Sequence, residues 1–407
     1  MNCKTEEESM DYPFANSIQD LRTSEIRDLM SLAARPDVIS FAGGMPNNHY
    51  FPLEEVDRIM AELPRDMKQK AFQYGPTPGL PFLIDAVKDY LGRKGLPVEE
   101  NEILITTGSL QAINIIAKAF VDPGDVIITE NPCFIGAISA FRSYRADIRP
   151  VEMDDEGIIP EKLEQTIDEA GDRLKFIYLT PFFHNPAGIL YSRERKQYIM
   201  DLVKNRNIVL LEDDAYGELW FDEDARKRVK PMKAVLEDSE KVCYVGSFSK
   251  IFGPGMRLGW MLVPRGIYQK CELIKQSMDA CSPSFTQVLA HQFVTSGKLY
   301  DYIDDIRKKY RESRDIMVES LKKYMPEEIE WQIPQGGFYI WFKMPGNIDA
   351  TEVLKPCLHA GAVFVIGKTF DPDGIKNNCF RLSYSNAPVE KIDEGIRIIA
   401  DTINKFL

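Results

Sequence analysis

The chain has 407 residues, and 62 acidic against 50 basic side chains give it a formal net charge of −12. A chain of this length folds into about two or three domains, and 44% hydrophobic and 28% charged residues are typical of globular proteins. The acidic balance argues against non-specific binding to nucleic acid and against a polybasic membrane-binding patch. Anionic ligands are still allowed, because a local pocket can oppose the overall charge.

The seven cysteines are odd in number, and none lies in a C-x-x-C pair. This argues against structural zinc and against a disulfide framework. Residues 1–11 are polar and acidic, unlike a signal peptide, and the longest charge-free stretches fall short of a membrane span. We therefore expect a cytoplasmic protein with no metal site, no membrane contact and no nucleic-acid partner.

Short apolar runs alternate with segments of helical periodicity through the first two thirds of the chain. The runs are rich in β-branched and aromatic residues and lie at 103–107, 126–129, 175–180, 208–211, 241–245 and 259–263. Helical spacing is found at 109–119, 161–170 and 193–205. Continuous apolar runs are typical of strands buried on both faces. The alternation predicts an α/β fold with a mostly parallel sheet flanked by helices.

The last third of the chain follows a different pattern. A long amphipathic helix is predicted over 299–324, followed by strands near 337–342, 362–366 and 380–384 and a closing helix at 389–406. This pattern is typical of a smaller α+β domain. We expect residues 1–50 to form an N-terminal arm and part of the small domain, residues 51–290 a large domain, and residues 291–407 the small C-terminal domain. The active site is expected between them.

The most informative segment is VGSFSKIFGPGMRLG at 245–259. Two hydroxyls, Ser247 and Ser249, follow a strand, and the cations Lys250 and Arg257 come soon after them. Hydroxyls beside two cations suit a phosphate group. A lysine near a second cation has a lowered pKa and can form a Schiff base with a carbonyl. For each residue alone, a solvated loop lysine or a surface arginine is the simpler interpretation. The glycines do not fit a dinucleotide-binding fingerprint.

Two further segments offer groups for an anion and for a ring. In TTGSLQ at 106–111, a Gly-Ser pair opens a helix and presents free N–H groups to an anion; a simple N-cap is the alternative. In LLEDDAY at 210–216, an aspartate at the end of a buried strand could keep a pyridine nitrogen protonated. Loop solvation or helix capping is the alternative for Glu212 and Asp214.

Two polar residues stand out from their neighbours. Asn185 lies between His184 and a proline, where it is either a turn former or an amide that could bond a phenolic oxygen. His184 itself is expected to be a packing or turn residue. Arg381 lies in the apolar strand at 380–384, where it needs either a ligand carboxylate or an internal salt bridge. Four histidines in all give little support to a catalytic triad or a metal cluster.

In their order and spacing, these segments resemble the class I aminotransferases, which are fold type I pyridoxal-phosphate enzymes. The resemblance is to the 2-aminoadipate and kynurenine aminotransferase branch and runs from about residue 24 to the C-terminus. It implies that the large domain binds pyridoxal 5′-phosphate. Lys250 would form the Schiff base and shuttle a proton, and Asp213 would pair with the ring nitrogen. Asn185 and Tyr216 would bond the ring oxygen.

The resemblance also assigns groups to the phosphate, the substrate and a second subunit. The phosphate cup would consist of Ser109, the backbone N–H of Leu110, Ser247, Ser249 and Arg257. Arg381 would hold the substrate α-carboxylate, with Asn185 and Gly44 close to the substrate. Arg27 would contact distal acidic side chains. Tyr74 matches a tyrosine that binds the phosphate of the neighbouring subunit, which implies a homodimer with shared active sites.

Position 134 departs from the family pattern. Many relatives carry a tyrosine that stacks on the cofactor ring, and here the residue is Phe134. Stacking depends on the π face, so it is retained without the hydroxyl. Loss of the hydroxyl's hydrogen bond can alter the substrate range.

The implied activity is transfer of an amino group from an L-amino acid of the aromatic, 2-aminoadipate or branched-chain type. The acceptor would be a 2-oxo acid, most simply 2-oxoglutarate, in a ping-pong reaction. Two alternatives use the same fold. One is a pyridoxal-phosphate-dependent C–S β-lyase, and the other is a non-enzymatic effector-sensing domain of a transcription regulator.

Overall fold

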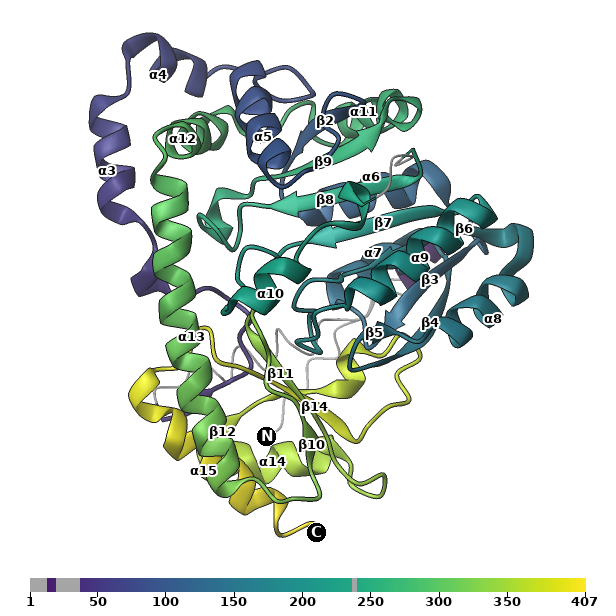
Figure 1. Ribbon diagram of the computed structural model, residues 1–407, viewed down its shortest axis with the longest axis vertical. Coiled ribbons are helices and arrows are strands. Elements are labelled where there is room, and N and C mark those ends of the chain that lie inside the picture. Colours follow the sequence, from purple (N-terminus) through teal and green to yellow (C-terminus); the bar gives the residue numbers. More distant parts are fainter. Residues whose placement is uncertain (1–12, 20–36, 236–239) are drawn as a thin grey trace, which may run out of the picture.

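The computed structural model describes residues 13–19, 37–235 and 240–407 (Figure 1). Its largest element is an eight-stranded sheet in the order β2-β9-β8-β7-β6-β3-β4-β5. The strands are Asn101–Thr106 (β2), Val126–Asn131 (β3), Asp147–Asp154 (β4), Gly157–Ile158 (β5), Leu174–Leu179 (β6), Val209–Asp214 (β7), Val242–Ser247 (β8) and Gly259–Pro264 (β9). Neighbours from β8 to β4 are parallel, whereas β9 is antiparallel to β8 and to β2. The predicted mostly parallel sheet is confirmed.

Helices cover both faces of this sheet. One face carries α6 (Ser109–Phe120), α7 (Ile135–Ser143) and α11 (Arg265–Asp279). The other face carries α8 (Pro160–Ala170) and α9 (Arg193–Arg206). The helices predicted from periodicity therefore flank the sheet as expected.

The burial of β6 shows why its sequence is an unbroken apolar run. Phe176 and Tyr178 pack with α6, α7 and α11, whereas Ile177 and Leu179 pack with α8 and α9. Both faces of the strand are buried, so no position selects a polar residue for solvent. The sequence does not predict β4, because DIRPVEMD lacks such a run. That strand lies next to the edge strand β5, and all but one of its residues are partly buried or exposed.

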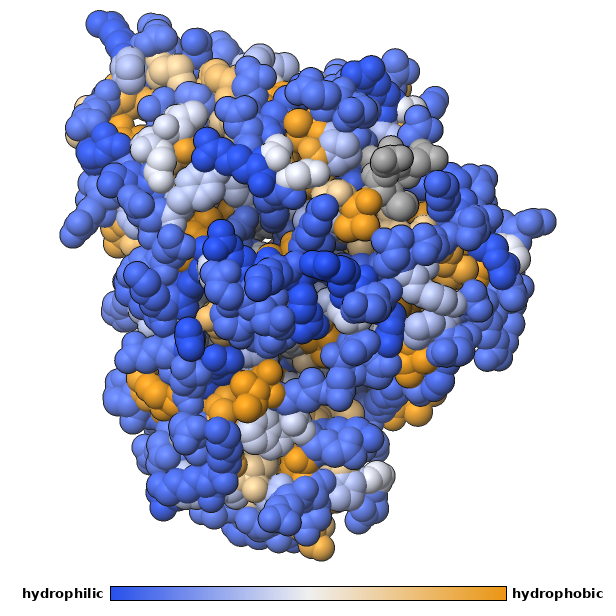
Figure 2. All heavy atoms as spheres, viewed as in Figure 1, coloured by the Kyte–Doolittle hydropathy of each residue, from blue (hydrophilic) through white to orange (hydrophobic). Residues whose placement is uncertain are grey.

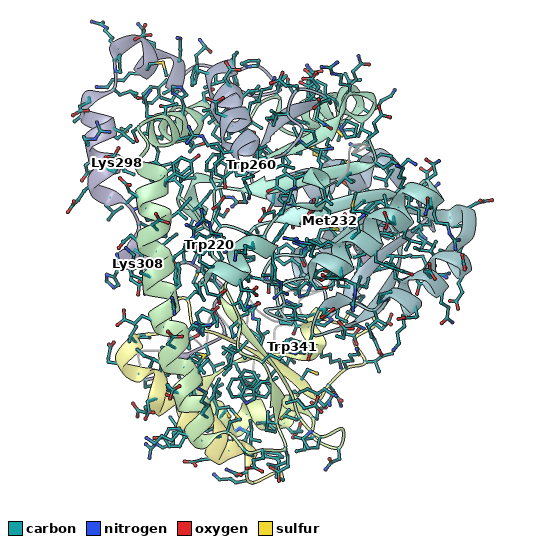
Figure 3. The ribbon with its side chains drawn as sticks, in the orientation of Figure 1. Trp220, Met232, Trp260, Lys298, Lys308 and Trp341 are labelled. Atoms are coloured by element: carbon teal, nitrogen blue, oxygen red, sulfur yellow. The ribbon has the colours of Figure 1, made fainter. Side chains whose placement is uncertain are left out.

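Further helices lie at the β2 end of the sheet and in its loops. They are α3 (Leu53–Glu62), α4 (Arg65–Ala71), α5 (Pro81–Arg93), α10 (Glu223–Arg228) and α12 (Ser284–Thr295). The short helix α1 (Asn16–Gln19) lies against α7 instead. Helices α5 and α12 share an apolar cluster with β2, β8 and β9, which includes Trp260. Figure 3 labels Trp260 in the large sheet and Trp341 in the small one.

A smaller sheet, in the order β10-β11-β14-β13, lies below the large one in Figure 1. Its strands are Glu330–Trp331 (β10), Tyr339–Lys343 (β11), Val365–Ile366 (β13) and Cys379–Ser383 (β14), and its helices are α13 (Lys298–Tyr324), α14 (Ala350–His359) and α15 (Ile392–Ile403). Ile39–Ser40 (β1) pairs in parallel with Ala362–Val363 (β12), so a segment near the N-terminus joins the C-terminal part. The domain boundaries near residues 50 and 290 remain predictions.

The surface is polar over most of the face drawn in Figure 2. Within the described ranges, no helix is long and apolar enough to cross a membrane. The six cysteines of those ranges are free thiols, and five of them are buried. Packing and hydrogen bonds, rather than disulfides, therefore hold the described part of the fold together.

We expect Leu211→Ala to lower the free energy of unfolding by about 2–5 kcal/mol, because it empties a fully buried site on β7. The control is Lys118→Ala on the exposed side of α6, which should change the free energy of unfolding by less than about 0.5 kcal/mol. Urea unfolding of the cofactor-loaded protein measures both. Equal midpoints for the two variants would contradict the central position of β7.

Candidate functional site

The candidate site is built where the parallel strands end. Asp213 on β7 is paired in register with Val245 on β8, and Tyr178 on β6 is paired with Leu211 on β7. Because these strands are parallel, their carboxyl ends meet at one edge of the sheet, where ligands bind in open α/β sheets. The acids, Asn185 and Lys250 all follow or end these strands.

Two of the three acids on β7 have their oxygens satisfied. Both oxygens of Glu212 accept hydrogen bonds from the backbone N–H groups of residues 232–233, at 2.7 and 3.1 Å. Asp214 accepts from the N–H of Gly217 at 2.7 Å and from the hydroxyl of Tyr244 at 2.5 Å. Both carboxylates are buried, so loop solvation is wrong for them. They bind their own chain and are not free for a ligand.

Asp213 differs from its two neighbours. One oxygen, Oδ2, accepts from the Tyr178 hydroxyl at 2.9 Å, whereas the buried Oδ1 has no partner among the described residues. Burial raises the pKa of this carboxyl to about 7, although the hydrogen bond from Tyr178 acts to lower it. A buried oxygen without a donor is unfavourable. The position therefore suits a ligand that brings a proton, such as a protonated ring nitrogen.

Lys250 directs its amine into the same region. Its Nζ donates to the carbonyl of Gly44 at 2.9 Å and lies 5.5 Å from the centre of the Tyr216 ring. Burial, together with the positive charges of Arg381 and Arg257, lowers the pKa of this lysine to about 8. A lysine with such a pKa is partly neutral near physiological pH and can attack a carbonyl.

Arg381 is a buried cation that has no carboxylate partner in the described ranges. Its Nη1 donates to Asn185 Oδ1 at 2.8 Å, and its Nη2 donates to the carbonyl of Ala42 at 2.7 Å. Its Nε is buried and has no partner there. The internal salt bridge considered from the sequence is thus not found. A guanidinium held only by neutral oxygens retains the capacity to bind an anion.

A tight approach of three strand ends forms the candidate phosphate cup. Gly259 is paired with Ser247 and with Thr106, and a Cβ on Gly259 would lie 3.0 Å from the backbone nitrogen of Ser109. At Gly108, where φ is +80°, a Cβ would lie 2.7 Å from Arg257 Nη2. Glycine at both positions brings the N-terminus of α6 against a guanidinium. Two positive groups this close favour an anion between them.

The hydroxyls of the cup are already in contact with each other. The Oγ atoms of Ser247 and Ser249 are 2.9 Å apart, and the backbone N–H of Ser249 donates to Ser247 Oγ at 3.1 Å. Helix α6 has no side-chain cap, so the first N–H groups of Ser109 and Leu110 stay open. Arg257 is exposed, which leaves this cup accessible from solvent.

The structure places the other predicted residues as follows. The ring of Phe134, at the start of α7, lies near Leu110, since a Cβ on Gly136 would lie 2.6 Å from Phe134 Cε1 and 3.4 Å from Leu110 Cδ1. Tyr74 lies on the surface, where 87% of its area is exposed. Arg27 lies outside the described residues.

The sequence interpretation missed two tyrosines of the site, Tyr178 and Tyr339. The Tyr339 hydroxyl lies 2.9 Å from the Tyr216 hydroxyl, and it occupies the place that a side chain at Gly44 would need. The Arg381 guanidinium lies over the Tyr339 ring, 4.3 Å from its centre. Both tyrosines stand in apolar strands, where a tyrosine indicates a core residue. The hydroxyl, which needs a buried partner, is the signal that could have found them.

These groups fit pyridoxal phosphate. An unpartnered carboxylate oxygen can receive the ring nitrogen, a lysine amine of lowered pKa can take the aldehyde, and the open N-terminus of α6 with Arg257 can take the phosphate. No cluster of His, Cys, Asp or Glu suited to a metal ion is found in the part of the chain that the structure describes.

Comparisons with known proteins agree with this geometry. A family model described as aminotransferase class I and II matches residues 37–399. An aromatic-amino-acid aminotransferase of Thermococcus litoralis is 35% identical over 99% of this chain and 97% of its own length. A 2-aminoadipate transaminase of Thermus thermophilus is 33% identical over 97% of each chain. A kynurenine aminotransferase structure from Pyrococcus horikoshii, in complex with PMP, has a TM-score of 0.93 and 37% identity over 97% of each chain.

The lowered pKa of Lys250 leads to a test on the cofactor-free protein. Because the amine loses its proton near pH 8 rather than 10.5, its acetylation by acetic anhydride should reach a plateau above about pH 9. Removing a nearby positive charge with Arg381→Gln should move the midpoint to higher pH. Arg265→Gln, an exposed change at the start of α11, should not move it. Competitive labelling with peptide mass spectrometry measures each midpoint, and a value near 10.5 in the unmodified protein would contradict the burial of the amine.

Proposed function

The chain belongs to the class I and II aminotransferases, and from that premise we propose which residues carry its reaction and which amino acids it accepts. It is an aminotransferase that uses pyridoxal phosphate. The observation that carries the proposal is the unpartnered Oδ1 of Asp213, in a site that also holds the amine of Lys250. The family match and the aminotransferases compared above favour transamination over the lyase and effector-sensing alternatives.

When bound, pyridoxal phosphate supplies an electron sink for the charge left on the substrate Cα after it loses its proton. In this proposal Asp213 keeps the ring nitrogen protonated through Oδ1. Lys250 Nζ would hold the cofactor covalently and would move the proton at the substrate Cα. Its lowered pKa allows the amine to accept a proton and to give it up again near neutral pH.

The substrate carboxylate is assigned to Arg381. The donors that face Asn185 and Ala42 fix the plane of the guanidinium, and Nε remains without a partner among the described residues. Asn185 and Tyr216 would bond the phenolic oxygen of the ring, which orients the ring for proton transfer. Ring stacking is assigned to Phe134 and proximity to the substrate to Gly44. The phosphate is assigned to Ser109, the N–H of Leu110, Ser247, Ser249 and Arg257.

For the amino donor we propose aromatic amino acids and 2-aminoadipate, with 2-oxoglutarate as the acceptor. The names of the Thermococcus litoralis and Thermus thermophilus relatives support these classes. Branched-chain amino acids are also proposed as amino donors. Arg27 is proposed to contact distal acidic groups and lies outside the described residues. Free thiols throughout the described part are consistent with a reducing cytoplasm as the setting.

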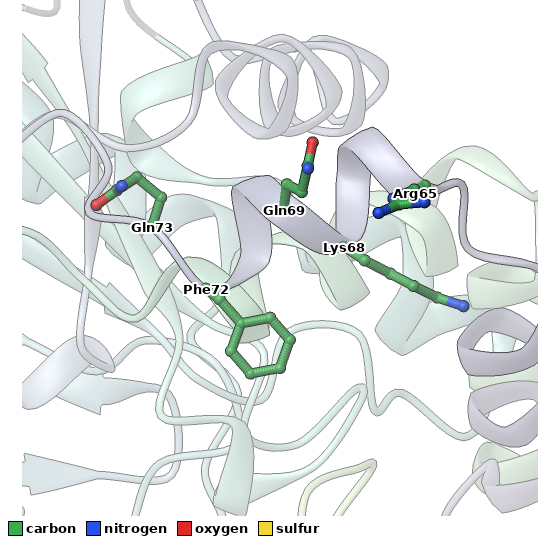
Figure 4. A pocket seen from close by; sticks show the side chains of 5 residues that line it. All are labelled: Arg65, Lys68, Gln69, Phe72 and Gln73. Atoms are coloured by element: carbon green, nitrogen blue, oxygen red, sulfur yellow. The ribbon is translucent and has the colours of Figure 1, made fainter.

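We further propose that the active unit is a homodimer in which Tyr74 reaches the phosphate of the partner. Figure 4 shows a hollow beside α4 that is lined by Arg65, Lys68, Gln69, Phe72 and Gln73. The adjacent aromatic side chains Phe72 and Tyr74 are 85% and 87% exposed. Two neighbouring aromatic residues left in water are typical of a surface that is covered by another molecule. A second copy of this chain is the occupant that the phosphate role of Tyr74 requires.

A panel of amino donors tests the substrate assignment. With 2-oxoglutarate present, aromatic amino acids and 2-aminoadipate should give glutamate at the highest kcat/KM. Lys250→Ala should give no measurable turnover with any donor and should lack the yellow colour of the loaded enzyme. Ammonia release without any added 2-oxo acid would contradict transamination and indicate a lyase.

A charge at position 72 tests the dimer. Phe72→Glu should shift the protein from dimer toward monomer in sedimentation and weaken cofactor binding, because a carboxylate in an apolar contact is costly to desolvate. Ile375→Glu, at a side chain that is 75% exposed in the small part, should leave both unchanged. Tyr74→Phe should keep the dimer and lower cofactor affinity about threefold to tenfold, for one lost hydrogen bond. A monomeric unmodified enzyme with full activity would contradict the shared site.

A further inference from the structure

Each strand beside β7 carries a buried tyrosine that donates to one of its carboxylates. Tyr178 on β6 donates to Asp213 at 2.9 Å, and Tyr244 on β8 donates to Asp214 at 2.5 Å. Both tyrosines are fully buried. The two pairs therefore have the same chemistry on neighbouring residues of one strand.

The two pairs differ in what else holds the carboxylate. Asp214 also accepts from the N–H of Gly217 at 2.7 Å and from Lys94 Nζ at 2.9 Å, so it is fixed without its tyrosine. Asp213 accepts only from Tyr178 among the described residues. The orientation of this one side chain depends on a single hydrogen bond.

We propose that Tyr178 is a positioning residue for the cofactor. Its hydroxyl binds Oδ2 of Asp213 and thereby turns Oδ1 toward the ring nitrogen of the cofactor. The inference rests on the proposed role of Asp213. The Tyr178 ring is itself fixed, because it packs edge-on against Phe141 with centres 5.5 Å apart. Burial raises the pKa of Tyr178, so its hydroxyl stays protonated and remains a donor.

The hydrogen bond also acts on the charge of Asp213. It lowers the pKa of the carboxyl, whereas burial and the nearby carboxylates of Asp214 and Glu130 raise it. Without Tyr178, the carboxyl would hold its own proton more tightly and would bind a ring nitrogen less well as an ion. Removal of the hydroxyl therefore weakens the binding of the ring nitrogen in two ways, through the orientation of the Asp213 carboxyl and through its charge.

The test compares Tyr178→Phe with its matched control, Tyr244→Phe. Cofactor affinity is measured by adding pyridoxal phosphate to the cofactor-free enzyme, and ring-nitrogen protonation is measured by NMR of the holoenzyme loaded with ¹⁵N-labelled cofactor. Tyr178→Phe should weaken binding about tenfold, as expected for a lost bond to a charged group, and should shift the ¹⁵N signal toward the unprotonated nitrogen. Tyr244→Phe should change neither by more than about twofold. Equal effects of the two variants would overturn the proposal.

A double-mutant cycle separates this inference from the role of Asp213. Asp213→Ala should weaken binding and shift the ¹⁵N signal, and adding Tyr178→Phe to it should cause no further loss. If Asp213→Ala changes neither, the role of Asp213 fails. If Asp213→Ala changes both but Tyr178→Phe changes neither, only the inference fails.

A second variant leaves position 178 intact and covers the case in which Tyr178→Phe does not fold. In Asp213→Asn the Tyr178 hydroxyl should hold the amide oxygen and turn the NH2 group toward the ring, so the nitrogen should be unprotonated. A ring nitrogen that is still protonated in this variant would mean that the amide oxygen faces it, and the proposal would be overturned.

Discussion

The site depends on one carboxylate that the fold buries and leaves half satisfied. Asp213 is the last but one residue of the central strand β7, with β6 and β8 on either side and a helical layer over one face of the sheet. A buried acceptor without a donor costs about 1–3 kcal/mol, which the fold accepts at this position while it satisfies both neighbouring acids. A cationic ring nitrogen offsets that cost when it binds. Affinity for the cofactor and the instability of the empty site therefore have the same physical origin.

The charges around this carboxylate oppose those of the whole molecule. The chain has a net charge of −12, yet Lys250 and Arg381 lie together in the site, where the positive charge of Arg381 helps to lower the pKa of the lysine. Their repulsion is tolerable because the ligands carry negative charge, on a phosphate and on a carboxylate. It also keeps the lysine amine reactive near neutral pH, since a solvated lysine would remain protonated. The net charge of the chain therefore describes its surface, whereas the chemistry of the site depends on a few buried groups.

The sequence predicted the fold where burial is uniform and missed it where burial is mixed. Strands such as β6 are covered on both faces, so their apolar runs were readable, whereas β4 is mostly partly buried and was not found. The residues of the site likewise divide into those that the sequence revealed and those that it did not. Lys250, Asp213 and Arg381 stood out as charges in apolar segments. Tyr178 and Tyr339 did not, because a tyrosine in a strand looks like packing until its hydroxyl partner is known. That partner depends on strand register, which one sequence does not contain.

The two sheets meet at the site through the backbone of one short segment. Between residues 41 and 45, four carbonyls accept hydrogen bonds: Phe41 from the N–H of Ser383, Ala42 from Arg381, Gly44 from Lys250, and Met45 from the hydroxyl of Ser385. Two of those donors belong to β14 and Ser385 lies two residues beyond it, whereas Lys250 lies in the turn that follows β8 of the large sheet. The group assigned to the substrate and the group assigned to the cofactor are thus tied to the same five residues. A glycine at position 44 is required there, because the Tyr339 hydroxyl fills the space of its side chain.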